Sequence, residues 1–426
     1  MNDAVFKNSS IGFKDKVFLL TFLFGIYIDF DYKLTEYIPI PAVFAGFAAL
    51  SWVLFSKIFL HKKVISFIIY FTLLSLITVF FGYDPNNYYL ADRINSLLIL
   101  IYSISLGYIA FCMLLTSNKV FLESVFFKIV VVLLFGSFLE VATPFKQIVT
   151  LFKESLYYEH YLAFERDIEF FGIVRPTFFS SEPSHLAIFF MFCLLNWWLL
   201  TENKKKNLIY MVSLLASLLV IRSPVLIGGF IFLAFNFIFF ELKKLNAYQK
   251  PLAILILPAF FLISLYFLSD FFAARLDAMF SLRDASFVIR IVVPPMLTYE
   301  VITASPLFGV GIGGKEVLFS EIINLYDYFD VPPVIYVGRL GQQFNNLFWE
   351  YIQYYGLLGG SIGLYLFRRL FFALSLESFI LYIFFIMLLW SQFFGAINGV
   401  RFWSFFFILT AVLIHRNNFL TLPSEK

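Results

Sequence analysis

The sequence predicts an all-α, polytopic integral membrane protein with about 12 transmembrane helices. Of its 426 residues, 61% are apolar and 14% are charged, and the mean hydropathy is +0.87, whereas soluble domains have about 45–50% apolar and about 25% charged residues. Apolar runs recur from residue 13 to residue 414, and roughly 20 such residues cross a bilayer as a helix. Because no polar stretch separates them, residues 1–426 are expected to form a single membrane domain.

The apolar runs alternate with short polar connections. The first run is followed by Asp29 without a small-residue cleavage site, so we expect a retained helix and not a removed signal peptide. Cys112 and Cys193 fall inside apolar runs and are expected to be buried as small hydrophobic residues. The predicted spans are approximately 13–28, 38–56, 64–82, 94–116, 120–141, 184–200, 207–221, 224–240, 251–269, 346–367, 372–391 and 398–414.

Lysine and arginine are distributed differently between the two faces of this topology. The N-terminus, the C-terminus and the loops on their face carry 15 Lys and 3 Arg, and the opposite face carries 4 Lys and 9 Arg. Positive charge near span ends concentrates on the cytoplasmic side, so both termini are predicted to be cytoplasmic. The planar guanidinium suits bidentate phosphate binding, and the external arginines therefore predict a phosphate or pyrophosphate ligand. Surface pairing, as of Arg166 with Glu165 and Asp167 or of Arg275 with Asp277, is the alternative for some of them.

Two long external loops, 143–183 and 270–345, interrupt the short connections, and long loops tend to carry function. The second contains two apolar stretches, 287–297 and 306–312, that are too short to span a bilayer. They predict short interfacial helices that lie on the outer leaflet or dip into it. The net charge of +3 gives no support to nucleic-acid binding.

The first candidate site ends the loop 143–183, where Arg175 precedes the start of the sixth span. Pro183 suits the first turn of a helix, and Ser181 can cap it. Glu182 and His185 place an acid and an imidazole about one turn apart, where they could exchange a proton with a hydroxyl group. An ordinary helix N-terminus is the alternative interpretation.

Two further arginines lie beside apolar helices. Arg222 ends the seventh span, and such an arginine usually has a partner or a ligand, with snorkelling to the head groups as the alternative. Arg290 precedes 306–314, a segment with four glycines that allow close backbone approach and can present amides to an anion. This segment lacks the Lys-Ser or Lys-Thr of a P-loop.

The tenth predicted span opens with Asn345 and Asn346, and Asn345 is expected to cap the helix. Glu350, Gln353 and Tyr354 lie within the apolar span and need polar partners, so they either brace the helix bundle or line a cavity. The histidines, cysteines and carboxylates show no spacing typical of a metal site, and no cofactor is expected.

Three motifs in this order give the chain a resemblance to the O-antigen polymerase and ligase superfamily of bacterial surface-polysaccharide assembly. The resemblance covers the architecture of the whole chain and is strongest over 175–363. The motifs are Arg175 before Glu182-Pro183, Arg290 before Pro-Leu-Phe-Gly-Val-Gly at 306–311, and Asn346 before Tyr-Gly-Leu-Leu-Gly at 355–359.

The resemblance implies an inner-membrane glycosyltransferase with a periplasmic active site and a donor glycan linked to undecaprenyl pyrophosphate. It also implies two partners, a chain-length-regulating co-polymerase and a flippase. Fixed arginines would stabilise the departing lipid pyrophosphate without a metal, and a base would accept the proton of the acceptor hydroxyl. The pyrophosphate-binding candidates are Arg175, Arg222 and Arg290, followed by Arg339 and Arg401, and further substrate-binding candidates are Asn345, Asn346 and Tyr355.

The ligases of this superfamily typically place a histidine immediately before the asparagine that opens the late span, where this chain has Asn345. An amide is not a base, so a polymerase is favoured over a ligase, and the base is expected to be Glu182, then His185, then Glu350. A ligase that uses another residue stays an alternative. A flippase would have cations within a central cavity and similar loops on both faces, and a structural scaffold would tolerate the loss of any one external arginine.

Overall fold

In the part of the chain that a computed structural model describes, the regular structure is helical apart from one short hairpin, in which β1 (Tyr32–Thr35) pairs antiparallel with β2 (Ile38–Ile40). The residues divide into two compact units. Unit 1 comprises 1–26, 31–116 and 278–426, and unit 2 comprises 27–30 and 117–277. The described residues are 12–35, 38–56, 61–84, 89–157, 164–242, 273, 275–332, 346–392 and 396–421.

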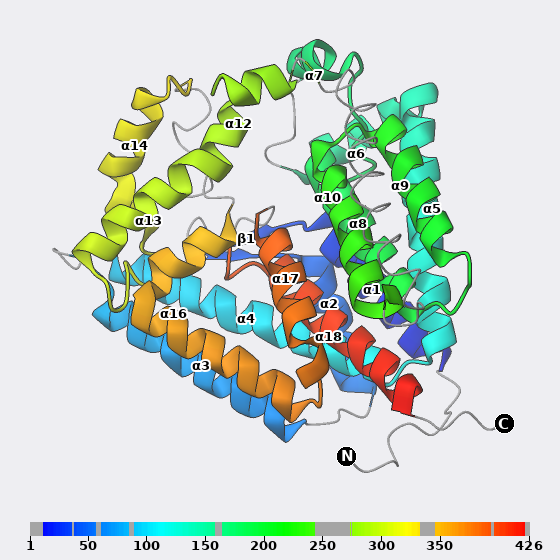
Figure 1. The fold of residues 1–426 in the computed structure, drawn as a ribbon, viewed down its shortest axis with the longest axis horizontal. Helices are drawn as coiled ribbons and strands as arrows, with labels where there is room; N and C mark the ends of the chain where they lie inside the picture. The colour runs from blue at the N-terminus through cyan, green and yellow to red at the C-terminus, as the bar shows by residue number, and fades with distance from the viewer. Residues whose placement is uncertain are drawn as a thin grey trace. The chain divides into compact units, whose positions relative to one another are not determined.

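Unit 1 is built around four packed helices. α18 packs against α4, and α3 packs against both α4 and α16, as Figure 1 shows for the blue α3 and the orange α16. The α-helices of this unit are α1 (Phe13–Ile28), α2 (Val43–Phe55), α3 (Lys62–Phe81), α4 (Leu90–Leu115), α12 (Ala285–Phe287), α13 (Val293–Ala304), α14 (Phe319–Tyr328), α16 (Leu347–Ala373), α17 (Ile380–Ser391) and α18 (Val400–Thr421). Shorter 3-10 and π turns are Val288–Val292, Gly314–Leu318 and Glu377–Phe379.

Aromatic side chains join α3, α16 and α18. The ring of Phe71 lies 5.6 Å from Phe367 and 5.2 Å from Trp403, and the rings of Phe367 and Trp403 stack at 6.1 Å. Each such pair contributes about 0.5–1.5 kcal/mol beyond its buried area. Gly107 lets α18 approach α4 closely, because a Cβ at this position would lie 2.7 Å from the carbonyl oxygen of Trp403.

A backbone interlock joins α16 to the segment 306–311. Gly356 has φ 62° and ψ −167°, which breaks the helical conformation inside α16. The segment fills this break through three backbone hydrogen bonds: Val310 N–H to the Gln353 carbonyl (2.9 Å), Leu357 N–H to the Pro306 carbonyl (2.7 Å) and Gly359 N–H to the Leu307 carbonyl (3.1 Å). Two of the three sequence motifs therefore form one structural feature.

The predicted interfacial helix at 306–312 is wrong, because this stretch forms turns. Gly309, Gly311 and Gly313 have φ of +60°, +77° and +75°, a left-handed conformation that ends helices and that L side chains rarely adopt. A Cβ on Gly309 would lie 1.9 Å from the Gln353 carbonyl oxygen. The predicted role of these glycines in close backbone approach is confirmed, and their predicted role in anion binding stays a prediction.

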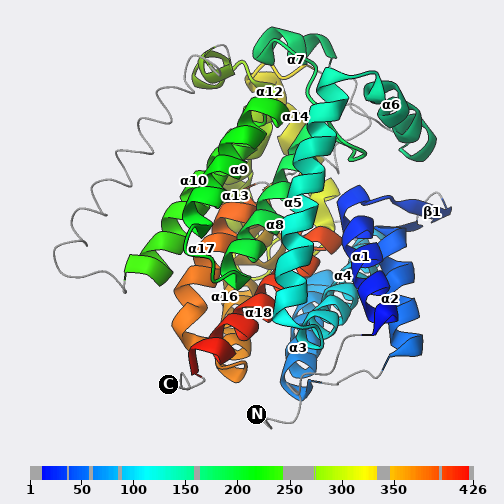
Figure 2. The same ribbon diagram turned by 90° about the vertical axis from the view of Figure 1, so that its right-hand side faces the viewer.

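Unit 2 is a second helical cluster, in which α5, α8 and α9 run side by side (Figure 2). Asn118 caps α5 by accepting from the Val120 N–H at 2.8 Å, and Pro183 opens α8, where its missing N–H costs no hydrogen bond. Nearly every side chain of α8 is buried. The helices of this unit are α5 (Lys119–Ala142), α6 (Phe145–Leu156), α7 (Phe164–Phe171), α8 (Pro183–Leu200), α9 (Lys206–Ile221) and α10 (Ile227–Asn236), which a π turn extends over Phe237–Glu241.

Six of the described helices are long and apolar enough to cross a membrane: Lys62–Phe81, Leu90–Leu115, Lys119–Ala142, Pro183–Leu200, Pro224–Glu241 and Ala285–Ala304. Within the described residues a helix lies on every predicted span, and the span 251–269 falls outside them. A helical membrane protein is therefore supported. Twelve spans and a single membrane domain stay predictions.

Two predicted boundaries are wrong. The stretch 287–297 belongs to a continuous helical run, Ala285–Ala304, that is longer than the apolar stretch and long enough to span. The span 38–56 is shortened to Val43–Phe55, since Pro39 and Pro41 lack an N–H donor and hold the residues before them extended. The loop 143–183 contains the short helices α6 and α7, as expected for such a loop.

Gly309→Ala is expected to destabilise the protein by about 2 kcal/mol or more, because the new Cβ meets the backbone of α16 and the left-handed φ is strained. The melting temperature of the purified protein in detergent measures this. Gly360→Ala in α16 is the matched control, since its Cβ would have an ordinary 3.5 Å contact with Tyr351. Equal melting temperatures for the two variants would contradict the interlock.

Candidate functional site

Arg175 forms a buried ion pair in unit 2. Its Nε and Nη2 both lie 2.8 Å from Oδ1 of Asp167, and its backbone N–H donates to Oδ2 of the same carboxylate at 3.2 Å. The exposed fractions of the two side chains are 6% and 0%. The structure thus gives Asp167 a partner, Arg175, that the sequence did not suggest, and the side chain of Arg166 lies outside the described part of the structure. This arginine is therefore held in one orientation by α7.

The loop after Arg175 is held by Glu140, near the end of α5. The Glu140 carboxylate accepts the backbone N–H groups of Thr177, at 3.1 Å, and Phe178, at 2.6 Å. Phe178 and Phe179 have positive φ, a strained conformation that the surroundings must impose. The Phe178 ring lies directly over Gly136, one turn earlier in α5, where any Cβ would collide with it.

Lys153 of α6 is a second buried cation in unit 2, and its exposed fraction is 7%. Burial lowers the pKa of its ammonium, while the carboxylates of Glu140, Glu182 and Asp167 oppose that shift. Carboxylates from α5, α7 and the start of α8 thus all favour the charged form of this ammonium.

Glu182 and His185 lie at the start of α8, and both are half-buried. The Glu182 carboxylate accepts from the Ser184 hydroxyl at 2.8 Å, and Nδ1 of His185 lies 2.7 Å from the Ser181 hydroxyl. Ser181 therefore orients the imidazole. The predicted cap by Ser181 is wrong, because no side chain accepts a hydrogen bond from the backbone at the N-terminus of α8. Proton exchange by His185 with a substrate would go through Nε2.

Arg222 lies close to Arg175 because both contact Phe171, the last residue of α7. Arg222 has φ 52° where α9 ends, and its Nη1 donates to the Phe171 carbonyl at 2.5 Å. The guanidinium of Arg175 lies 4.2 Å from the centre of the Phe171 ring, and that of Arg275 lies 5.5 Å from it. Three guanidinium groups thus gather around one aromatic residue.

Arg290 of unit 1 differs from these arginines. Its side chain is half-buried, and among the described residues its guanidinium has no hydrogen bond, ion pair or aromatic partner. Its backbone carbonyl accepts from Nδ2 of Asn346 at 2.9 Å, and the same amide donates to Oε1 of Gln392 at 2.9 Å. Asn346 thus holds the Arg290 backbone in place, although it makes no side-chain cap on α16.

Glu350 of α16 has a fully buried carboxylate in an ion pair with Lys315, at 2.5 Å. It also accepts the Ile397 N–H at 2.7 Å, and the Lys315 ammonium lies 5.8 Å from the centre of the Tyr354 ring. Removing one partner of such a pair leaves a buried charge without compensation. The arrangement is that of a brace between α16 and the turn Gly314–Leu318.

The remaining candidates are spread through unit 1. Tyr355 is buried and its hydroxyl lies 2.7 Å from the Ser75 hydroxyl, which joins α16 to α3. Nε of Arg401 donates to the Ile26 carbonyl at 3.3 Å, near the end of α1. Arg339 and Asn345 lie outside the described residues.

Sequence reasoning missed the roles of Glu140, Lys153, Asp167 and Lys315. Glu140 carried a usable signal, since a carboxylate inside an apolar span needs a partner. The other three lie in loop segments, where nothing in the sequence distinguishes a buried charge from an exposed one. Among the described residues no group of three His, Cys, Asp or Glu side chains is placed to hold a metal ion.

No protein-family model, curated protein or solved structure matches the chain. The resemblance to the O-antigen polymerase and ligase superfamily therefore stays a prediction that rests on the three sequence motifs.

Asp167→Asn is expected to lower the stability by about 3–5 kcal/mol, because it leaves the buried Arg175 guanidinium uncompensated. The double variant Asp167→Leu with Arg175→Met should recover most of this loss, since it removes both charges. Melting temperatures in detergent measure both effects. Lys119→Met is the control, because it breaks the exposed pair with Glu202, which is worth less than about 1 kcal/mol. An Asp167→Asn variant as stable as this control would contradict the structural role of the Asp167–Arg175 ion pair.

Proposed function

We propose that the protein is an inner-membrane polysaccharide polymerase of the O-antigen polymerase and ligase superfamily. In this proposal twelve spans place both termini in the cytoplasm and the loops 143–183 and 270–345 in the periplasm. The enzyme is a metal-independent glycosyltransferase that moves the growing glycan from undecaprenyl pyrophosphate to a new lipid-linked repeat unit. A flippase delivers the repeat units, and a co-polymerase regulates chain length.

The observation that carries the proposal is the state of Arg290. A half-buried guanidinium on an apolar helix, with no partner among the described residues, is costly unless it serves a ligand. Its planar fork suits the oxygens of a pyrophosphate. Asn346 and Gln392 fix the backbone that carries it, which is the preorganisation that charge stabilisation in a transition state requires.

The reaction breaks the bond between the anomeric carbon of the donor glycan and the pyrophosphate oxygen, which keeps the electron pair. The acceptor hydroxyl oxygen forms the new bond to that carbon, and its proton passes to a base. Arginine side chains stabilise the charge of the departing pyrophosphate. Arg290 takes this role, with Arg175 and Arg222 as the candidates in unit 2.

Glu182 is the preferred base. Its carboxylate is half-buried at a helix start, where a substrate hydroxyl can reach it, and it follows the loop that carries Arg175. Glu350 is less suited, because its fully buried carboxylate is already bound to Lys315 and to the Ile397 N–H. His185 is the second candidate, acting through Nε2.

Arg290→Ala is expected to abolish chain growth in cells while membrane insertion and protein level stay normal, because its guanidinium has no partner to lose among the described residues. A gel of the cell's lipopolysaccharide, blotted for the repeat unit, measures chain length. The control is Arg283→Ala in the same segment, an exposed arginine that donates to Ser281. Normal polymer in the Arg290 variant would exclude this arginine from the site.

Glu182→Gln is expected to lower the polymerisation rate by about 10²–10⁴-fold, the usual contribution of general-base catalysis. Glu182→Gln keeps the shape of the side chain and removes the basic oxygen. His185→Gln, measured in parallel in membranes at one protein level, is the comparison. If only the histidine variant loses activity, the base is His185 and the assignment of Glu182 is wrong.

Deletion of the gene separates the alternatives from the proposal. A polymerase predicts that the lipopolysaccharide ladder collapses to core plus one repeat unit. Bare core with accumulated lipid-linked polymer would indicate a ligase, and bare core with single repeats held on the cytoplasmic face would indicate a flippase. If the protein is a structural scaffold, a variant in which Arg175, Arg222 or Arg290 is replaced should restore the ladder of the deletion strain.

A further inference from the structure

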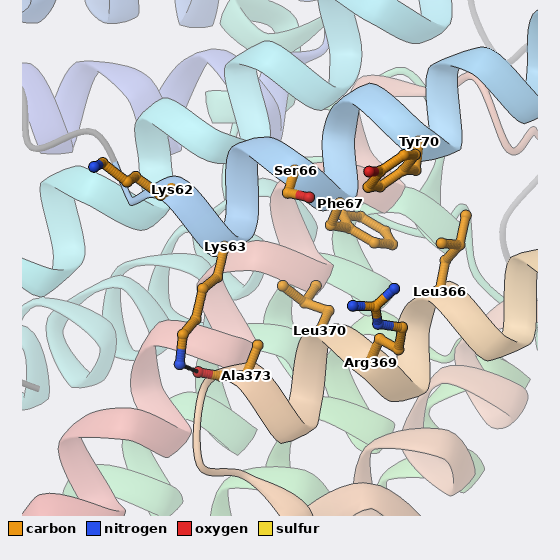
Figure 3. Close-up of a pocket in the computed structure, with 9 residues that line it drawn as sticks. All are labelled: Lys62, Lys63, Ser66, Phe67, Tyr70, Leu366, Arg369, Leu370 and Ala373. Carbon is orange, nitrogen blue, oxygen red and sulfur yellow. Dashed lines mark hydrogen bonds between the residues drawn. The ribbon is translucent and has the colours of Figure 1, made fainter.

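A cavity of about 330 Å³ lies between α3 and α16 in unit 1, at the end where α3 begins and α16 finishes (Figure 3). On α16 its lining begins at Leu366, well after Gly356, and Arg290 lies on neither of the two helices. None of the residues proposed above for polymerisation lines it. Its lining is Lys62, Lys63, Ser66, Phe67 and Tyr70 of α3, and Leu366, Arg369, Leu370 and Ala373 of α16.

The polar side chains of this cavity are hydrogen-bond donors. Lys62, Lys63 and Arg369 are cations, Ser66 and Tyr70 add hydroxyl groups, and no carboxylate lines the cavity. Among the described residues none of the three cations has an ion-pair partner. Three cations without an acidic neighbour repel one another, and an anion bound among them removes that repulsion.

Lys63 shows that this arrangement also has a structural part. Its ammonium donates to the Ala373 carbonyl at 3.0 Å, one of the carbonyls that the end of α16 leaves without a helical partner. An ammonium has three donor hydrogens, so this bond leaves capacity for a ligand. Figure 3 shows the Arg369 guanidinium between the two helices, beside Phe67 and Leu370.

The remainder of the cavity is apolar. Phe67 and Leu370 are buried at its base. One turn further along the same faces the helices carry exposed apolar side chains, Leu73 of α3 and Ile362 of α16, with exposed fractions of 48% and 39%. Since α3 is long and apolar enough to cross a membrane, these side chains form a surface along which an acyl chain would lie.

We propose that this cavity binds the phosphate group of an anionic phospholipid, with the acyl chains along the exposed apolar faces of α3 and α16. Basic pockets between transmembrane helices on the cytoplasmic side are suited to such head groups. The lysine-rich face is the one that the sequence assigns to the cytoplasm, and Lys62, Lys63 and Arg369 belong to it. The shared chemistry is a phosphate oxygen, and the apolar surface favours a lipid over free phosphate.

For the test, the purified full chain is placed in nanodiscs of phosphatidylcholine with a minor fraction of phosphatidylglycerol. Native mass spectrometry then measures which lipids the protein retains. Retention of phosphatidylglycerol over phosphatidylcholine is expected, and Lys62→Gln and Arg369→Gln should each weaken it by about fivefold, the value of one basic residue near an anionic surface. Lys63 is left unchanged in both variants because of its bond to Ala373.

Arg368→Gln is the matched control, because Arg368 is the sequence neighbour of Arg369, lies over the Phe372 ring and does not line the cavity. Retention in this variant should equal that of the unchanged protein. Equal retention of the two lipids, or equal losses in the Arg368 and Arg369 variants, would overturn the proposal. If millimolar inorganic phosphate displaces the lipid, and stabilises the purified protein as much as the lipid does, free phosphate is the ligand. That result would overturn the lipid assignment.

Discussion

The apolar composition of this chain imposes one constraint on its whole structure, because a backbone polar group that is removed from water must find its partner within the protein. The break at Gly356 in α16 would leave such groups unpaired, and the backbone of 306–310 supplies their partners. The same segment also pairs with the residues that follow α3, where the Tyr83 N–H donates to the Gly309 carbonyl at 2.8 Å. One turn thus supplies hydrogen-bond partners to α16 and to the segment after α3.

The buried charges obey the same constraint. Arg93 of α4 has an exposed fraction of 2% and donates to the carbonyls of Val79, Gly82 and Tyr83, which lie at the end of α3. Arg175 and Glu350 are likewise bound to Asp167 and Lys315. Such charges build the scaffold, and pairing is what distinguishes them from Arg290. A charge that the described scaffold does not use is the better candidate for ligand binding, which is why Arg290 carries the functional proposal.

Helix positions followed from the sequence because an apolar run of about 20 residues has few alternatives to a helix. The segments that depart from this rule have local causes: two prolines shorten the span at 38–56, and glycines with positive φ turn 306–312 away from a helix. The run Ala285–Ala304 was underestimated since its polar residues, including Arg290 and Glu300, interrupt the apolar pattern without interrupting the helix.

The candidate site was predictable only in part. Arg175, Glu182 and His185 stood out because they lie close together in the sequence, and the structure places Glu182 and His185 at the start of α8. Asp167, which binds Arg175, sits among other charges, and Glu140, which holds the loop after Arg175, is remote in sequence. Only the fold brings these carboxylates to that loop, and no pattern in a single sequence encodes their contacts.

The most direct test of the central claim is reconstitution of the purified protein in vesicles with a synthetic undecaprenyl-pyrophosphate-linked repeat unit as the sole substrate. Mass spectrometry of the glycolipids should find two-repeat and longer glycans, with one undecaprenyl pyrophosphate released for each bond formed, and the Arg290→Ala protein should form none. Single repeats that remain unjoined with active protein, or that are transferred only when a lipid A-core acceptor is added, would contradict the polymerase.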